Sequence, residues 1–218
     1  MILLNNISKR FGKKSLFEQL SLPIAAYQIT VLLGENGAGK STLLQILAGL
    51  ERADSGEILY FEERKTAKDL KDFVGYVPQD IALWEHLSIE DNIQFFRSLI
   101  KQPISQQQIN DYYEQLHLVD LHQPVSQLSG GTKRKANIIV GLLAAPHFLI
   151  LDEPTVGIDL KSRYEIHQLL RHLKQSHTII MTTHHIDELE SVADQIAVIG
   201  KDPFYSDVLT AKNMSFYK

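Results

Sequence analysis

A glycine-rich segment near residue 40 has the residue types and spacing of a phosphate-binding loop. It fits the pattern G-x-x-x-x-G-K-[ST] and reads Gly34-Glu35-Asn36-Gly37-Ala38-Gly39-Lys40-Ser41, followed by Thr42. Glycines let successive backbone N–H groups converge on a phosphate, and a helix that begins near Lys40 would add its N-terminal dipole. In this pattern Lys40 reaches the β- and γ-phosphates, and the hydroxyl of Ser41 ligates Mg²⁺. A chance match in a chain of this length is expected roughly once in a hundred chains, so we expect a nucleoside triphosphate site.

Two neighbouring carboxylates form a second candidate site. Asp152 and Glu153 directly follow the apolar segment Phe148–Leu151. In proteins with a phosphate loop, the first acid after such a strand helps to hold Mg²⁺. The second acid can act as a general base toward an attacking water. Without the phosphate loop, the pair would equally well be ordinary charges at a strand end beside Pro154.

Between these two sites lies the pentapeptide Leu128-Ser129-Gly130-Gly131-Thr132. Ser129 is suited to cap the helix that follows, and the two glycines permit a close backbone approach to an anion at the helix N-terminus. Taken alone, the pentapeptide is equally typical of a helix cap with a glycine turn.

The three motifs, in this order, resemble those of the ATP-binding cassette (ABC) family. The pentapeptide is similar to the family signature, usually LSGGQ, although Thr132 replaces the glutamine. The resemblance covers nearly the whole chain and implies that ATP is sandwiched between two subunits. Ser129, Gly130 and Gly131 would then face the γ-phosphate bound to the opposite subunit.

Four further residues match the family pattern, and their roles are implied by that resemblance. Gln79 corresponds to the Q-loop glutamine, which contacts Mg²⁺ and senses the membrane partner, and Asp159 to the D-loop at the dimer interface. His184 corresponds to the switch histidine that contacts the γ-phosphate. Phe11 corresponds to the aromatic that stacks on adenine, although an isolated phenylalanine is more typical of a core.

Other polar residues near these motifs are expected to have no role in the chemistry. We interpret His185 as a bystander, because the family places the switch at the first histidine of the pair. Lys133, Arg134 and Lys135 follow the signature near a helix N-terminus, where the dipole disfavours cations, and we expect them to form a solvated face.

The elements that would position these residues indicate an α/β fold. Five apolar runs rich in β-branched residues are predicted to be strands of a parallel sheet buried on both faces: Ile29–Leu33, Val74–Val77, Phe148–Leu151, Thr178–Met181 and Ile196–Ile199. Segments with helical spacing alternate with them. The resemblance implies a P-loop NTPase core of the RecA-like type. The first 25 residues and Glu57–Phe61 are predicted to be antiparallel strands.

The chain is expected to be one domain, 1–218, with an insertion. Residues 88–128 are polar, show helical spacing and contain no convincing strand, so we predict a helical subdomain there. Residues 1–87 and 129–218 would form the α/β core with its antiparallel strands. We expect no additional regulatory domain after Ile199.

Composition limits the function classes. The net charge is −4 and there is no cysteine, which argues against a nucleic-acid partner held by a basic surface and excludes thiolate chemistry. The N-terminus lacks the features of a signal peptide, and the longest apolar stretch, Ile138–Leu151, is interrupted by Pro146 and His147. We therefore expect a cytoplasmic protein, peripheral on the inner face of the membrane and attached through a partner.

The function predicted from these features is ATP hydrolysis, with ATP and Mg²⁺, that powers transport through a separate membrane-spanning permease. The cassette would pair with an identical or a similar one. Export is favoured by analogy, because residues 131–135 and 154–159 resemble exporter cassettes. Trp84, Phe95 and Phe96 could form the docking groove for the permease, or belong to the core of the helical subdomain.

Two alternatives remain open at this point. One is a soluble ABC ATPase in translation or DNA maintenance, although such members usually carry a second cassette or a long coiled coil. The other is a non-catalytic assembly module, against which Glu153 and His184 speak.

Overall fold

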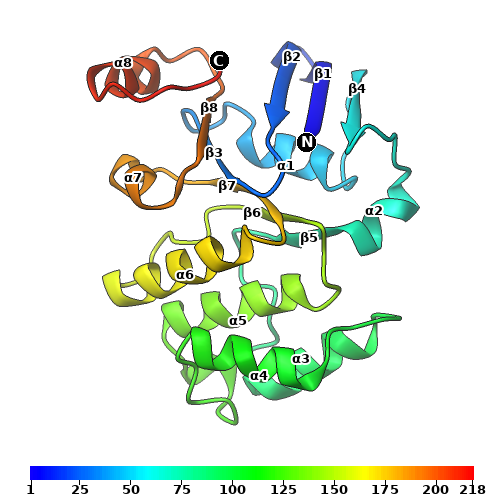
Figure 1. Ribbon diagram of the computed structural model, residues 1–218, viewed down its shortest axis with the longest axis vertical. Coiled ribbons are helices and arrows are strands. Elements are labelled where there is room, and N and C mark those ends of the chain that lie inside the picture. The colour runs from blue at the N-terminus through cyan, green and yellow to red at the C-terminus, as the bar shows by residue number, and fades with distance from the viewer.

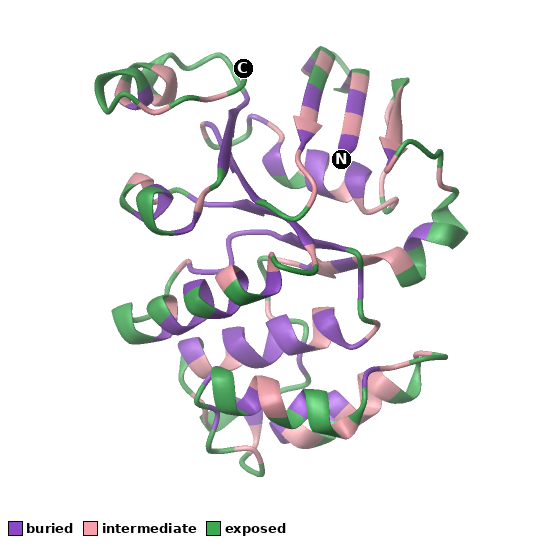
Figure 2. Cartoon of the chain, viewed as in Figure 1, coloured by how far each residue is buried: buried purple, intermediate pink, exposed green.

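A five-stranded parallel sheet forms the centre of the computed structural model, which describes residues 1–218 (Figure 1). Its strand order is β5-β6-β7-β3-β8. The strands are β3 (Ile29–Leu33), β5 (Val74–Val77), β6 (Phe148–Leu151), β7 (Thr178–Thr182) and β8 (Gln195–Val198). All five predicted strands are present, and every residue of β3, β6, β7 and β8 is buried (Figure 2). The strands of the parallel sheet are apolar throughout because other helices and strands cover both faces of the sheet.

Side chains alternate across the parallel sheet and supply two separate cores. On β6, Leu149 and Leu151 belong to the larger core with the helices, whereas Phe148 and Ile150 belong to the smaller one. The smaller core also contains α1 (Lys40–Leu47) and residues of the second sheet. The period-two alternation of a strand therefore divides its residues between two layers.

The second sheet has three antiparallel strands in the order β2-β1-β4. They are β1 (Ile2–Phe11), β2 (Lys14–Ile24) and β4 (Ser55–Tyr60). The antiparallel strands predicted in the first 25 residues and at Glu57–Phe61 are present. Together with the parallel sheet and the helices, they confirm the predicted fold class.

The helices on the other face of the parallel sheet begin at capping side chains. The Ser129 hydroxyl accepts from the Thr132 N–H at 3.1 Å at the start of α5, and Asp159 accepts from the Ser162 N–H at 2.9 Å at the start of α6. Helix α5 spans Gly130–Leu142 and α6 spans Leu160–Leu173. The remaining helices are α2 (Ala67–Phe73), α3 (Ile89–Ser98), α4 (Gln106–Gln115), α7 (Leu189–Val192) and α8 (Phe204–Ala211). Two 3₁₀ turns are η1 (Val125–Gln127) and η2 (Ile186–Glu188).

The segment expected to be helical, residues 88–128, contains α3, α4 and η1 and no strand. Helix α5 packs against both α3 and α6, so it joins this segment to the core (Figure 1). None of the helices combines the length and the apolar character needed to cross a lipid bilayer.

Replacing Tyr60 by Phe is expected to destabilise the protein without affecting the chemistry. The buried Tyr60 hydroxyl donates a 2.7 Å hydrogen bond to the carbonyl of Leu47 at the end of α1. Its loss leaves that carbonyl unpaired in the core, so the free energy of unfolding should fall by about 1–2 kcal/mol. Urea denaturation checks this, with the exposed Tyr27→Phe as control; an unchanged midpoint for Tyr60→Phe would contradict the prediction.

Candidate functional site

The segment between β3 and α1 forms a tight loop that depends on glycine at Gly39. This residue precedes α1 with φ = 98°, a conformation that L side chains rarely adopt. A Cβ there would lie 2.7 Å from a ring carbon of Phe17 on β2. Both the backbone conformation and the neighbouring strand therefore require glycine, and the loop passes directly into the N-terminus of α1.

Lys40 is held along this loop. Its Nζ donates to the carbonyl oxygens of Gly34, at 2.8 Å, and Glu35, at 3.2 Å. The residue is only 7% exposed. Burial lowers the pKa of the Lys40 ammonium, and the carboxylates of Glu153, Asp152 and Glu35 partly oppose that shift. The buried ammonium group of Lys40 therefore lies at the N-terminus of α1, where an anion would bind.

The two candidate carboxylates extend from the end of β6 toward the same region. Asp152 is 4% exposed and Glu153 is 7% exposed. Thr182, on the neighbouring strand β7, donates to Asp152 Oδ1 at 2.7 Å and accepts from the Glu153 N–H at 2.8 Å. The backbone of Glu153 has φ = 49°, an uncommon value for a residue with a side chain. One threonine therefore fixes the positions of both acids, and sequence analysis did not identify it.

His184 follows β7 and meets the second of these acids. Its Nε2 contacts Glu153 Oε1 within ion-pair distance. Because β6 and β7 are neighbours in the parallel sheet, residues that follow their carboxyl ends converge. The two residues predicted to act on the attacking water and on the γ-phosphate are thus adjacent, although they lie 31 positions apart in the sequence.

A pocket of about 430 Å³ lies between Lys40 and Glu153. It is lined by Phe11, Lys14, Leu16, Asn36, Gly37, Gly39, Lys40, Ser41, Thr42, Gln79 and Glu153. The predicted adenine-side aromatic, phosphate loop, Q-loop glutamine and general base therefore surround one space. Phe11 is 52% exposed, which excludes the alternative that it is a core aromatic, and the Lys9 ammonium lies 4.9 Å from its ring centroid.

The signature and D-loop residues lie outside that pocket. Ser129 and Gly130 are exposed at the start of α5, and Asp159 is exposed at the start of α6. The two helix starts adjoin, because a Cβ at Gly131 would overlap the Ser162 hydroxyl and lie 3.0 Å from Asp159 Oδ2. Within one subunit, these groups present a second polar surface separate from the phosphate loop.

The expectation that residues 133–135 form a solvated face is wrong for Arg134 and Lys135. Both are buried, and the Lys135 ammonium forms a buried ion pair with Glu165 of α6. Arg134 donates to the Pro78 carbonyl at 3.2 Å, beside Gln79, and burial lowers the pKa of its guanidinium. The second turn of α5 faces the core, where Glu165 neutralises the lysine, and this partner is 30 positions away in sequence.

The aromatic residues after Gln79 form a partly exposed group. Trp84 is 46% exposed, and its ring centroid lies 4.6 Å from that of Phe95. Phe96 lies 5.4 Å from Phe95 and packs against the larger core. Phe96 therefore matches the core alternative, while Trp84 presents its indole to the surface.

Comparison with known proteins identifies the family of this chain. The family model described as ABC transporter matches residues 17–156. The chain belongs to the ABC transporter family. It is an ATP-binding cassette, and its reaction is ATP hydrolysis that energises transport.

Curated relatives of this ABC cassette include a resistance ATP-binding protein and an import ATP-binding protein. It is 35% identical to the linearmycin resistance ATP-binding protein LnrL of Bacillus subtilis, over 92% of this chain and 67% of that protein. It is 37% identical to the sulfate/thiosulfate import ATP-binding protein CysA of Thermosynechococcus vestitus, over 92% of this chain and 61% of that protein. The cassette thus spans about two thirds of LnrL and less than two thirds of CysA.

Solved structures agree with the fold of this cassette. CbiO1 of Clostridium perfringens, described as part of the ABC transporter complex cbiONQ, superposes with a TM-score of 0.79 at 26% identity, covering 91% of this chain and 84% of that one. The dimeric ATP-binding cassette MJ0796, bound to ADP and Pi, gives a TM-score of 0.79 at 23% identity, covering 91% and 94%.

Proposed function

We propose that this cassette binds ATP between its own phosphate loop and the signature of a second cassette, and hydrolyses it with Glu153 as general base. The observation that carries this proposal is the single pocket lined by Phe11, Lys40, Ser41, Gln79 and Glu153. Phe11 would stack on adenine, and the loop from Gly34 to Thr42 would bind the phosphates.

The residues around the pocket suit a hard divalent cation. Ser41 and Gln79, which line the pocket, and Asp152, which directly precedes the lining residue Glu153, offer hydroxyl, amide and carboxylate oxygens, the ligands that Mg²⁺ prefers. The chain has no ready-made group of three or more acidic, histidine or cysteine ligands. This suits an ion that is held by one carboxylate together with substrate phosphates. When bound, Mg²⁺ would neutralise charge on the phosphate oxygens.

In the proposed reaction, the oxygen of a water molecule forms a bond to the γ-phosphorus. At the same time, the Glu153 carboxylate accepts a proton from that water. The bond to the β–γ bridging oxygen breaks, giving ADP and phosphate. Lys40 stabilises the charge on the transferring group, and His184, beside Glu153, contacts the γ-phosphate.

The second cassette supplies what one subunit lacks. Ser129, Gly130 and Gly131 lie outside the pocket that the phosphate loop lines, and Ser129 and Gly130 are exposed, so this helix start can face ATP on a partner. Asp159 would cross the same interface. The partner is an identical or a similar cassette, and the dimeric cassette MJ0796 supports the paired arrangement.

The membrane partner would be a permease on a separate chain, with the cassette on the cytoplasmic face of the membrane. LnrL and CysA, both named as ATP-binding proteins, support this assignment. We further propose export, on the likeness of residues 131–135 and 154–159 to exporter cassettes and on the resistance relative LnrL. Trp84, exposed beside Phe95 and just after Gln79, is the proposed permease contact.

A tagged pull-down from native membranes tests the transporter assignment. We expect a multi-helix membrane protein in stoichiometric amount, identified by mass spectrometry. Trp84→Ser should reduce its recovery about tenfold, since a buried aromatic anchor contributes most at an interface. Phe204→Ser, which alters an exposed aromatic on α8, is the matched control. Recovery of ribosomal or DNA-associated proteins instead would contradict the assignment and favour the soluble alternative.

A further inference from the structure

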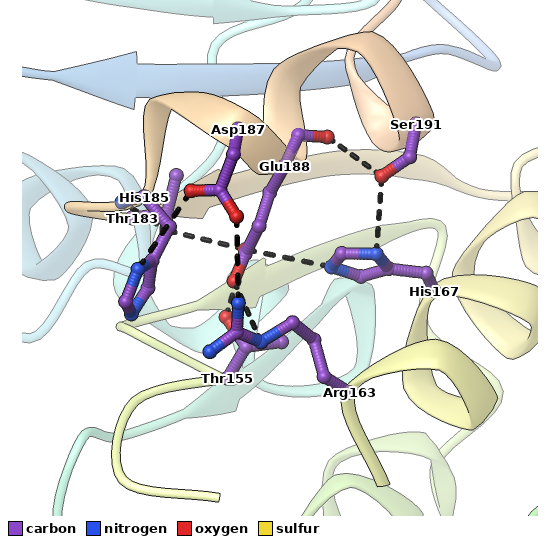
Figure 3. Close-up of polar contacts among 8 residues, drawn as sticks. All are labelled: Thr155, Arg163, His167, Thr183, His185, Asp187, Glu188 and Ser191. Carbon is purple, nitrogen blue, oxygen red and sulfur yellow. Dashed lines mark hydrogen bonds and ion pairs between the residues drawn. The ribbon is translucent and has the colours of Figure 1, made fainter. Parts of the chain in front are cut away.

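A buried polar cluster is centred on Glu188 (Figure 3). Glu188 ends the 3₁₀ turn η2 and is 3% exposed. Its Oε2 accepts hydrogen bonds from the hydroxyls of Thr155, at 2.9 Å, and Thr183, at 3.2 Å. Both threonines are fully buried. A buried carboxylate is thus held by two hydroxyls from different loops.

Two basic side chains from α6 complete the cluster. Arg163 Nε lies 3.1 Å from Glu188 Oε1, and His167 Nε2 lies 3.4 Å from Oε2 (Figure 3). Burial raises the pKa of Glu188, but the neighbouring His167 imidazole, the hydrogen bond from Thr155 and the charge of Arg163 outweigh it and leave the pKa below its ordinary value. Glu188 is therefore an ionised, neutralised centre at neutral pH.

The two threonines belong to the loops that carry the candidate catalytic residues. Thr155 is two residues after Glu153, on the loop that follows β6, and Thr183 immediately precedes His184, on the loop that follows β7. Thr183 also accepts from the His185 N–H at 3.1 Å. Glu188 is thus hydrogen-bonded to both loops at once.

We propose that Glu188 is a positioning residue that sets the placement of Glu153 relative to His184. The Glu188 carboxylate bonds both Thr155 and Thr183 and is itself held by Arg163 and His167 of α6. It thereby fixes the separation of the loops that follow β6 and β7. This inference rests on the proposed roles of Glu153 and His184.

The phosphate loop is independent of this cluster. It follows β3 and is held by Lys40 and by contacts with β2, none of which involves Glu188. Loosening the cluster should therefore lower kcat and leave KM for ATP nearly unchanged. Small displacements of catalytic groups reduce rates by up to about a hundredfold.

Two substitutions at Thr155 separate positioning from packing. Thr155→Val keeps the side-chain volume and removes the hydroxyl, whereas Thr155→Ser keeps the hydroxyl and removes a methyl group. If the hydrogen bond to Glu188 positions the loop, kcat should fall about tenfold in Thr155→Val and less than about threefold in Thr155→Ser. If only packing matters, Thr155→Ser is the more damaged variant, and that order, or equal rates, would overturn the proposal.

Glu188→Gln is the second test, measured as steady-state ATP hydrolysis by the full chain. It should lower kcat about tenfold with KM within about twofold of the parent. Glu190→Gln is the matched control, because Glu190 lies on the adjacent α7 and pairs with Lys212 at the surface. Thermal unfolding of every variant, followed by circular dichroism, shows that the protein assayed is folded. An unchanged kcat in folded Glu188→Gln contradicts the proposal.

The failure of this inference is distinguishable from failure of the proposed function. If Glu153→Gln and His184→Ala both retain parental kcat, the assigned catalytic roles are wrong. If those two variants lose activity while Thr155→Val and Glu188→Gln retain it, the catalytic roles stand and only the positioning role is rejected.

Discussion

Glu153→Gln is expected to lower kcat for ATP hydrolysis by about 10²–10⁴-fold while ATP binding persists. Glu153 is buried, and its carboxylate is the proposed acceptor of the water proton. Glutamine has the same shape, but its amide does not accept a proton at neutral pH. The bound nucleotide therefore remains intact, and the ATP-bound pair of cassettes should accumulate.

Two measurements on the same preparation check this prediction. Steady-state phosphate release gives kcat, and size-exclusion chromatography with light scattering, with and without ATP and Mg²⁺, gives the dimer fraction. Glu62→Gln, at an exposed glutamate remote from the pocket, is the control. Normal turnover in Glu153→Gln would reject the assignment of Glu153 as general base.

Lys40→Ala is expected to reduce kcat/KM for ATP by about 10²–10³-fold, in line with the loss of one charge-stabilising donor. Lys40 is the buried cation of the loop, and its Nζ also bonds the carbonyls of Gly34 and Glu35. The substitution therefore removes both the charge proposed to face the phosphates and the internal support of the loop.

The distinction from Glu153→Gln lies in nucleotide affinity. Titration with a fluorescent ATP analogue should show weakened binding in Lys40→Ala and near-normal binding in Glu153→Gln. Lys101→Ala removes an exposed lysine outside the pocket and serves as control. Parental affinity and turnover in Lys40→Ala would show that the loop does not bind phosphate through this side chain.

Much of the fold was predictable because its signals are local. The five apolar runs became the five parallel strands, since a strand covered on both faces needs apolar residues throughout. The phosphate loop was predicted from spacing alone, and its requirement for glycine at Gly39 has, besides the backbone conformation, a tertiary cause in the ring of Phe17. The strand order could not be obtained in this way, because pairing depends on contacts between distant segments.

The solvated face expected at residues 133–135 shows where local argument fails. The helix dipole disfavours cations near an N-terminus, but the effect is about 0.3–1 kcal/mol at an exposed position. A buried partner such as Glu165 outweighs it, and that partner is identified only when α5 packs against α6. Thr182 was missed for the same reason, since its contacts with both acids arise from the pairing of β6 with β7.

The sequence by itself determined the family, the phosphate loop, the acid pair and the strands that carry them, because these depend on residue type and short spacing. Only the tertiary structure decided that Glu153 meets His184, that Arg134 and Lys135 point inward, and that Glu188 joins two loops. These contacts link residues brought together by neighbouring strands and packed helices, and their energies depend on burial and on partners that no local pattern contains.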